Sequence, residues 1–591
     1  MNTKNGYSFF CLITLLFLFG LKANAAESES KKLTTLLDEI WKYELQVSPL
    51  MASREGEAIN PDKLADISPA ALKKQHQTWQ QFLSRLATIN TSELSDSEQI
   101  SLLMQQYRLE NYIDEYRFNA HLVPITSEYG FHSAMASLPR SMHLKDEQDF
   151  EHYLSRLAAI EANFEQNIAY MREGMRIGLT QPKVVLAGFE ESVTPYLVDD
   201  PSKSDFYAPF KTMPAHLSDA KKKKFQDRAK AVIKKSVIPA YQMVYDFLVS
   251  EYIPNGRSDI AAKSWPDGED YYQNRIKHYT TTEMSAKDIH ALGLSEVKRI
   301  RAEMQTIVDK LEFNGSIDEF IHFLRTDPQF YATSAEELLK AASFIAKKMD
   351  AKLPQLFEFL PRTPYGVEAV PESIAPKYTT GRYISPSRDD QPGYYWVNTY
   401  ALDKRPLYAL TALTLHEAVP GHHLQISLAA EMKALPKVRQ NTYISAFGEG
   451  WGLYSEYLGI ETDMYKDPYD DFGRLSYEMW RACRLVVDTG MHMFGWSRQQ
   501  AIDFMLTNTA LSEHNVRTEI DRYISWPGQA LSYKIGEIKI KALRNQAEEK
   551  LGSHFDVRKF HRAVLEHGSV PLFILEKNIN TFIQSELTKV K

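Results

Sequence analysis

Cysteine is almost absent from this chain, with only Cys11 and Cys483 among 591 residues. Cys11 lies in an N-terminal apolar run that we expect to be removed, so the mature chain keeps one thiol and cannot form an internal disulfide. Its stability must therefore come from an ordinary hydrophobic core, which a chain of this length can build. A metal site in such a chain would use histidine and carboxylate rather than thiolate, a donor set that suits zinc.

Long apolar runs are also missing beyond the first segment. Residues 9–20 are apolar, Lys4 precedes them, and residues 23–25 offer an Ala-x-Ala cleavage site. These features predict a signal peptide over residues 1–25 and export to the periplasm or the medium. Cys11 comes too early for a lipoprotein cleavage site. No second apolar stretch of about 20 residues follows, so we expect no stable membrane insertion after cleavage.

A strong charge of either sign is the third absence. The net charge is −7, and loss of Lys4 and Lys22 with the signal peptide makes it more negative by two. A mildly acidic chain of this kind argues against nucleic acid as the main partner. The number of subunits is left open.

Helical periodicity dominates what is present. Leu33, Leu36, Leu37 and Ile40 recur at helical steps, and Ser95 with Glu98 is a plausible capping box. A Pro- and Gly-containing connection near residue 265 divides an N-terminal helical lobe, 26–265, from a second lobe, 266–591. Residues 366–399 are rich in β-branched and aromatic side chains, which predicts two to four short strands. The expected fold is therefore mainly α, with two lobes and a small β-sheet.

The most informative stretch is residues 413–425, LTLHEAVPGHHLQ. A His-Glu pair followed by a further His is the pattern by which a helix presents two imidazoles to zinc and a carboxylate to water. The second ligand usually lies at the fourth residue after the first, but that position is Pro420. Because Pro-Gly favours a kink or a π-type bulge, we expect the chain to return His422 to the face of His416. His423 is the alternative ligand.

A catalytic zinc needs a third protein ligand and an open position. Glu449, within GEGW, is the leading candidate because the glycines beside it would let its helix approach the first one closely. Glu456 lies seven residues later, near the same helical face, and is expected to hold a ligand imidazole or to replace Glu449. We thus predict one Zn²⁺ per chain within residues 416–456, with Glu417 as general base for the metal-activated water.

Three strings support a resemblance to a known family: HEAVPGHHLQ, GEGWGLYSE and PGQALSYKIG. They lie between residues 393 and 536 and resemble bacterial proteins of domain-of-unknown-function family 885. That family is similar to zinc peptidases with a glutamate as third ligand, such as angiotensin-converting enzyme and the oligopeptidases. The resemblance implies a two-lobed, zinc-peptidase-like fold. It also implies a site in a deep cleft that admits oligopeptides.

The same resemblance implies a tyrosine that stabilises the transition state. An Arg-Tyr pair late in the chain provides it in the angiotensin-converting enzymes, and Arg522-Tyr523 is similar. Tyr533 is the rival, because Pro527-Gly528 would start a helix that carries it.

Substrate contacts are expected from two regions. In peptidases of this type an edge strand ahead of the metal helix pairs with the substrate, a role that fits residues 394–398 and so Tyr395 and Asn398. Basic side chains that could hold a substrate carboxylate, giving carboxypeptidase or dipeptidyl-carboxypeptidase action, are Arg481, Arg484, Arg522 and Lys534.

Two other functions remain open. A zinc amidase or deacylase acting on a non-peptide or cell-wall amide would need the same groups. A catalytically dead periplasmic binding or scaffold protein is a third possibility, although a general base beside a ligand, Glu417, has no purpose in a pure binder.

Overall fold

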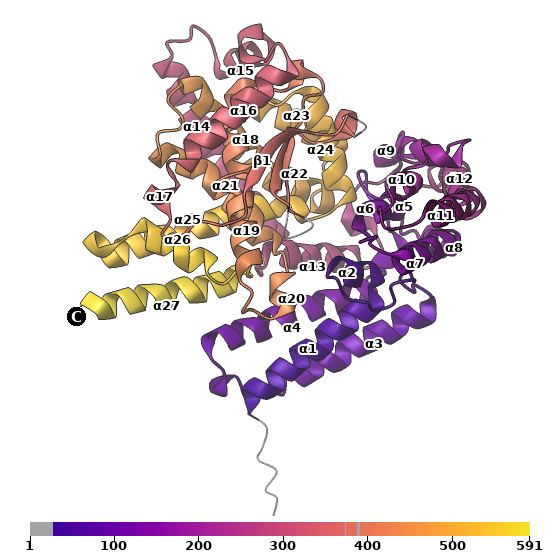
Figure 1. Cartoon of the computed structure of the whole chain (residues 1–591). Coiled ribbons are helices and arrows are strands. Elements are labelled where there is room, and N and C mark those ends of the chain that lie inside the picture. The colour runs from indigo at the N-terminus through magenta and orange to yellow at the C-terminus, as the bar shows by residue number, and fades with distance from the viewer. Residues whose placement is uncertain (1–27, 373, 387–390, 591) are drawn as a thin grey trace, which may run out of the picture.

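The computed structural model describes residues 28–372, 374–386 and 391–590. The predicted signal peptide, residues 1–25, lies outside these described residues. As the sequence predicts, the fold is mainly α with one small sheet (Figure 1).

The N-terminal helices form two groups in Figure 1, one at the bottom and one on the right. The bottom group contains α1 (Glu29–Val47), α2 (Pro49–Arg54), α3 (Pro69–Leu86) and α4 (Asp96–Arg117). The right-hand group contains α5 (Phe131–Met135), α6 (Leu138–Ser141), α7 (Glu147–Ala158), α8 (Ile160–Ile177), α9 (Lys183–Leu186), α10 (Ala208–Lys211), α11 (Asp219–Val232) and α12 (Ile238–Phe247). Ser95 and Glu98 form the predicted capping box at the start of α4, where the side chain of each residue accepts a hydrogen bond from the backbone N–H of the other.

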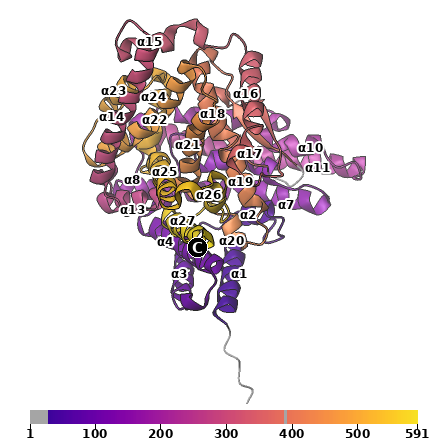
Figure 2. The same cartoon turned by 90° about the vertical axis from the view of Figure 1, so that its left-hand side faces the viewer.

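The remaining helices build the upper and left-hand part of the molecule and part of its lower centre (Figure 1). They are α13 (Gly268–Thr280), α14 (Ala286–Lys310), α15 (Ile317–Thr326), α16 (Ala335–Asp350), α17 (Leu353–Leu356), α18 (Leu410–Glu417), α19 (His422–Glu431), α20 (Lys437–Gln440), α21 (Ser445–Glu461), α22 (Pro468–Met493), α23 (Arg498–Asn508), α24 (Glu513–Ser525), α25 (Ser532–Leu551), α26 (Val557–Leu565) and α27 (Leu572–Val590). Helix α22 is buried over most of its length and packs against α14, whereas α21 packs against α25 and α18. Both cartoon views show α1 and α3 projecting from the lower side (Figures 1 and 2).

The sheet has three strands, within the predicted range. They are β1 (Tyr365–Ala369), β2 (Gly381–Ile384) and β3 (Gly393–Val397), in the order β1-β3-β2. Strand β3 pairs in parallel with β1 and antiparallel with β2. The expectation that residues 394–398 form a substrate-binding edge strand is therefore wrong, because strands cover both edges of β3.

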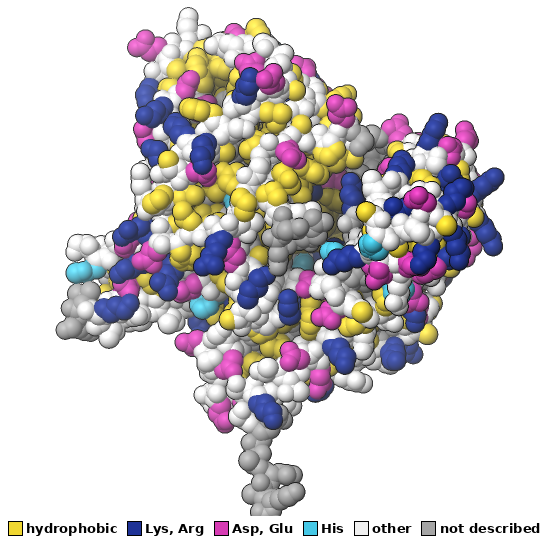
Figure 3. Space-filling view, viewed as in Figure 1, with side chains coloured by type: hydrophobic (Ala, Val, Ile, Leu, Met, Phe, Trp, Pro, Cys, Tyr) yellow, Lys and Arg dark blue, Asp and Glu magenta, His cyan; other side chains and the backbone are white. Residues whose placement is uncertain are grey.

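One surface helix, α11, is rich in lysine and arginine. Lys and Arg side chains gather on the right-hand edge in Figure 3, over α11. Several of them have acidic partners there, including Lys221 with Glu147 and Arg228 with Glu151. Among the described residues, no helix combines the length and the apolar character that crossing a bilayer requires.

Candidate metal centre

A four-residue break separates α18 from α19 and brings their ends together. Helix α18 ends at Glu417 and α19 begins at His422, with a cis Val419–Pro420 peptide between them. Gly421 N–H donates to the carbonyl of Leu415 at 3.0 Å. A Cβ at position 421 would lie 1.9 Å from the carbonyl oxygen of His416, so only glycine fits this close approach. The predicted kink is thus a complete interruption of the helix.

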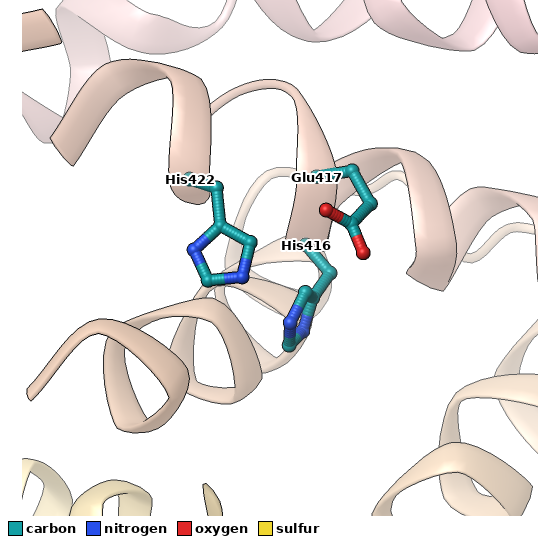
Figure 4. Close-up of side chains that lie close together, drawn as sticks. All are labelled: His416, Glu417 and His422. Carbon is teal, nitrogen blue, oxygen red and sulfur yellow. The ribbon is translucent and has the colours of Figure 1, made fainter. Parts of the chain in front are cut away.

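This break makes three side chains converge. Figure 4 shows His416, Glu417 and His422 extending toward one another, and each offers a ligand atom within 4.8 Å of the others. Glu449, from α21, completes the group: its Oε2 lies 3.6 Å from His416 Nε2 and 3.4 Å from His422 Nε2. Two imidazoles and the carboxylate predicted as third ligand therefore face a common point.

The separations fit a shared metal ion better than hydrogen bonds. Contacts of 3.4 and 3.6 Å lie at or beyond the useful limit of an N–H···O bond. Two ligand atoms on one tetrahedral zinc, each about 2.1 Å from the ion, are roughly 3.4 Å apart. Glu417 is the other possible third ligand, but the ligand atoms of its group with His416 and His422 lie within 4.8 Å of one another, whereas Glu449 lies within 3.6 Å of both imidazoles. His416, His422 and Glu449 are thus the residues whose geometry fits zinc.

The electrostatics of this group also favour a cation. Burial lowers the pKa of His416, but the carboxylates of Glu449 and Glu456 outweigh burial and raise that pKa to about 10. Burial raises the pKa of Glu449, yet His422 and His416 hold it well below its usual range. The negative charge that retains a proton on His416 would equally attract a divalent ion, which would bind in competition with that proton.

Helix α21 orients the first imidazole. Glu456 Oε1 lies 2.8 Å from His416 Nδ1, which directs Nε2 toward the common point, and Arg481 approaches the same oxygen at 3.3 Å. This is the contact that the seven-residue spacing from Glu449 predicted. A Cβ at Gly452 would lie 2.6 Å from His416 Cε1, so the imidazole occupies space that glycine leaves free.

Two tyrosines at this centre were missed by sequence reasoning. The backbone N–H of Tyr383, in β2, donates to Glu417 Oε2 at 2.7 Å. The Tyr443 hydroxyl donates to Glu449 Oε1 at 3.2 Å. A backbone donor leaves no signature in a sequence, and Tyr443 belongs to no motif, so neither contact had a detectable signal.

His423 points to a different neighbourhood. Its Nδ1 lies 3.0 Å from the Tyr383 hydroxyl and 3.3 Å from Ser427 Oγ, and its ring packs against Tyr365. Burial lowers its pKa to about 4. Of the two histidines considered from the sequence, the structure brings His422, not His423, to Glu449.

A cavity of about 640 Å³ opens beside the centre. Its lining comes from α4 in the N-terminal part of the chain and from α13, β2, α18, α22 and α24 in the later part. Tyr129 and Arg382 meet across it, because the Arg382 guanidinium donates to the Tyr129 hydroxyl at 2.8 Å. The lining includes His416, Glu417 and His422, so the candidate metal centre forms part of the cavity wall.

The two candidate tyrosines have different surroundings. The Tyr523 side chain is 1% exposed, and its hydroxyl accepts bonds from Trp480 Nε1 and Arg484 Nε at 2.9 and 2.6 Å. Tyr533 lines the cavity, and its ring stacks on His416 with 6.4 Å between centroids. The prediction of Tyr523 as a catalytic group is therefore wrong: its hydroxyl is occupied and lies outside the cavity lining.

Three predicted substrate contacts are also wrong. Tyr395 is fully buried with its hydroxyl toward Thr414, and Asn398 donates to backbone carbonyls of residues 375, 378 and 379. Lys534 is fully buried among Glu296, Glu478 and Glu537, at 2.7–3.0 Å. All three side chains are bonded to partners inside the protein, and none lines the cavity.

Strand β2 supplies the free edge that sequence reasoning assigned to β3. Asn398 N–H bonds to the carbonyl of Thr380, so alternate residues of β2 bond to β3. Gly381 and Tyr383 thus present their backbone groups to the other side, as the bond from Tyr383 N–H to Glu417 confirms. Both residues line the cavity.

Comparisons with known proteins place the chain in a family. One solved structure, described as "the putative lipoprotein from Colwellia psychrerythraea", is 29% identical with a TM-score of 0.88, covering 94% of this chain and 100% of that one. Another, "a putative lipoprotein of unknown function from Shewanella oneidensis", is 19% identical with a TM-score of 0.71, covers 93% and 99%, and shows likeness of fold alone. No protein with a curated description matches. The profile of "Bacterial protein of unknown function (DUF885)" matches residues 49–579, and the chain belongs to this family.

Proposed function

We propose that this protein is an exported zinc hydrolase that cleaves amide bonds of peptides. The observation that carries the proposal is the approach of His416 Nε2 and His422 Nε2 to one oxygen of Glu449, at 3.6 and 3.4 Å, in the wall of a cavity. Export is supported by the signal-peptide pattern in residues 1–25 and by likeness to proteins described as lipoproteins. The protein would act in the periplasm or the medium.

A zinc ion held by these three groups would supply a Lewis acid for the substrate carbonyl and lower the pKa of a water. Glu417, fixed by the Tyr383 N–H, takes a proton from the attacking water and delivers it to the leaving nitrogen. The carbonyl carbon gains the water oxygen as the C–N bond breaks, so the products are a carboxylate and an amine. Tyr533 is the hydroxyl donor available to the carbonyl oxygen as its charge develops.

The cavity edge of β2 gives the substrate a place to bind. Because Glu417 already accepts from the Tyr383 N–H, the backbone groups of Gly381 and the carbonyl of Tyr383 are those that an extended peptide can pair with, in the manner of strand addition. Such pairing forms hydrogen bonds with the main chain of the substrate rather than with its side chains, so it favours peptides over other amides. This feature supports peptide hydrolysis ahead of an amidase acting on non-peptide substrates.

The proposal is tested by metal content and by turnover of a peptide library. Glu417→Gln is expected to keep about one zinc per chain and to lose about 10²- to 10⁴-fold in turnover. His416→Ala is expected to lose the zinc. His423→Ala is the matched control, because this neighbouring histidine faces Tyr383 and should leave zinc content unchanged. Zinc retained at wild-type affinity by His416→Ala, or full activity of Glu417→Gln, would contradict the proposal.

A further inference from the structure

Three buried arginines line the cavity beside the metal centre. Arg481 and Arg484 extend from α22 and Arg522 extends from α24; we call them the arginine cluster. Their exposed fractions are 4%, 2% and 8%. A buried guanidinium needs acceptors for its N–H groups, because an unpaired charge in the interior is costly.

Arg481 contacts Glu456 at 3.3 Å, whereas the other two arginines of the cluster depend on a single carboxylate. Glu519 lies 3.1 Å from Arg484 and 3.6 Å from Arg522, so two cations share one anion. Glu128 also acts on Arg522 electrostatically, but its side chain is exposed, and no hydrogen bond joins the two in the described part of the chain. Glu128 acts on Arg484 as well, so within the described residues Glu519 is the one carboxylate in direct contact with this pair of guanidinium groups.

The cluster also has unused donors. Within the described residues, Arg484 Nη1, Arg522 Nε and Arg481 Nε are buried without a hydrogen-bond acceptor. Interiors rarely leave such donors unpaired unless a ligand or water completes them. A planar carboxylate is the anion whose geometry matches a guanidinium fork.

Tyr533 sets the distance between this cluster and the metal centre. The Arg484 guanidinium lies 4.1 Å from the centroid of the Tyr533 ring, and the same ring stacks on His416 at 6.4 Å. The two contacts place the Arg484 guanidinium within about 10.5 Å of the His416 ring. This span is comparable with two to three residues of extended chain at about 3.5 Å each.

We propose that Arg484 and Arg522 bind the free C-terminal carboxylate of a peptide, so that the metal centre removes one or two residues from its C-terminal end. This inference rests on the proposed function and specifies its substrate class. The bond that breaks is the amide one or two residues before the carboxylate; water provides the hydroxyl to the new C-terminus and a proton to the released amine. Lys534, saturated by three glutamates, takes no part.

The test compares two peptides that differ only in their last group, a free acid and a C-terminal amide. The holoenzyme is expected to cleave the acid with a kcat/KM about 10- to 100-fold above that of the amide, the loss associated with a hydrogen bond to a charged group. Arg522→Gln should remove most of this preference by raising KM for the acid. Arg517→Gln is the matched control, because Arg517 lies on the same helix, pairs with Glu513 and is partly exposed, at 41% of its side chain.

Binding gives a second readout that needs no turnover. Calorimetry with Glu417→Gln should show the acid binding about 10- to 100-fold more tightly than the amide. Equal affinity for the two peptides would overturn the arginine proposal even if both were cleaved. If neither peptide is cleaved but the acid binds selectively through Arg522, the hydrolase proposal fails and the carboxylate site stands. Even if Arg522→Gln fails to fold, the affinities of the acid and amide peptides for a protein that keeps all three arginines still test the proposal.

Discussion

At the scale of single residues, the centre depends on which hydroxyls and carboxylates remain free. Tyr523 and Tyr533 lie ten positions apart, yet the Tyr523 hydroxyl accepts two short bonds from Trp480 and Arg484, at 2.9 and 2.6 Å. The Tyr533 hydroxyl has one long contact with Arg522, at 3.5 Å, and the Tyr533 ring borders His416. The same distinction separates Arg522, with a donor to spare, from Lys534, with three acceptors. Whether the donors and acceptors of a side chain are already bonded, rather than its residue type, therefore separates the candidates for function.

The two tyrosines should respond oppositely to loss of their hydroxyls. Tyr533→Phe is expected to keep the metal and the stability of the wild type but to lower kcat by about 10²-fold or more, because a donor to the developing oxyanion is removed. Tyr523→Phe leaves two buried donors without an acceptor, so it should lower the free energy of unfolding by about 1–3 kcal/mol. Steady-state kinetics and urea unfolding of both variants measure the difference. A Tyr523→Phe enzyme with the larger kcat defect would reverse the assignment.

Sequence spacing was sufficient to predict that the candidate ligands converge, but not to predict their surroundings. His416, His422, Glu449 and Glu456 were predictable because local rules apply: a Pro-Gly break, a glycine-flanked glutamate and a seven-residue helical repeat. The contact of Glu417 with Tyr383 was not predictable, since it joins segments 34 residues apart through a backbone N–H.

At the scale of elements, close approach of helices decides whether the centre can form. Helix α21 passes the end of α18 at Gly452, and an added methyl there would meet the His416 ring, which Glu456 holds in place. Strand order belongs to this scale as well. The strands themselves were predicted from their β-branched and aromatic residues, but composition contains no information on which strand lies in the middle, so β3 was mistaken for an edge.

Gly452→Ala tests the approach of α21. Alanine favours a helix over glycine by about 1 kcal/mol, but the new Cβ would lie 2.6 Å from His416 Cε1 and displace the imidazole. We expect zinc affinity to fall by at least about 10-fold, as for loss of ligand orientation, with helical content unchanged. Competition with a chelator measures the affinity.

Ser455→Ala is the control for this variant. It lies on the same helix, and its buried hydroxyl has no partner within the described residues, so its removal should leave zinc affinity unchanged. Wild-type affinity in Gly452→Ala would show that the His416 ring has room to move and would refute the packing argument.

At the scale of the whole molecule, distant segments meet around α22. Asp488 accepts a bond from the Tyr272 hydroxyl of α13 at 2.5 Å and from the Gly528 N–H at 3.2 Å, so it joins three parts of the chain. It is fully buried, and burial raises its pKa to about 7. The native state therefore binds this proton more tightly than the unfolded chain, whose aspartate has an ordinary pKa near 3.9.

Stability should accordingly fall as pH rises through the range between these two pKa values. Asp488→Asn keeps the shape without the charge, so it should match the wild type near pH 4 and exceed it near pH 8, by on the order of 2–4 kcal/mol. Apparent melting temperatures of both proteins at the two pH values measure this difference. The exposed Asp309→Asn, on α14, is the control and should follow the wild type throughout. A constant difference between Asp488→Asn and wild type would contradict the assignment.

The central claim is that α18, α19 and α21 together hold one divalent ion. Anomalous diffraction at the zinc absorption edge, from crystals grown with zinc, tests it most directly. The account predicts one strong peak about 2.0–2.2 Å from His416 Nε2, His422 Nε2 and a carboxylate oxygen of Glu449. No peak at this point, or a peak on His423 instead, would contradict it.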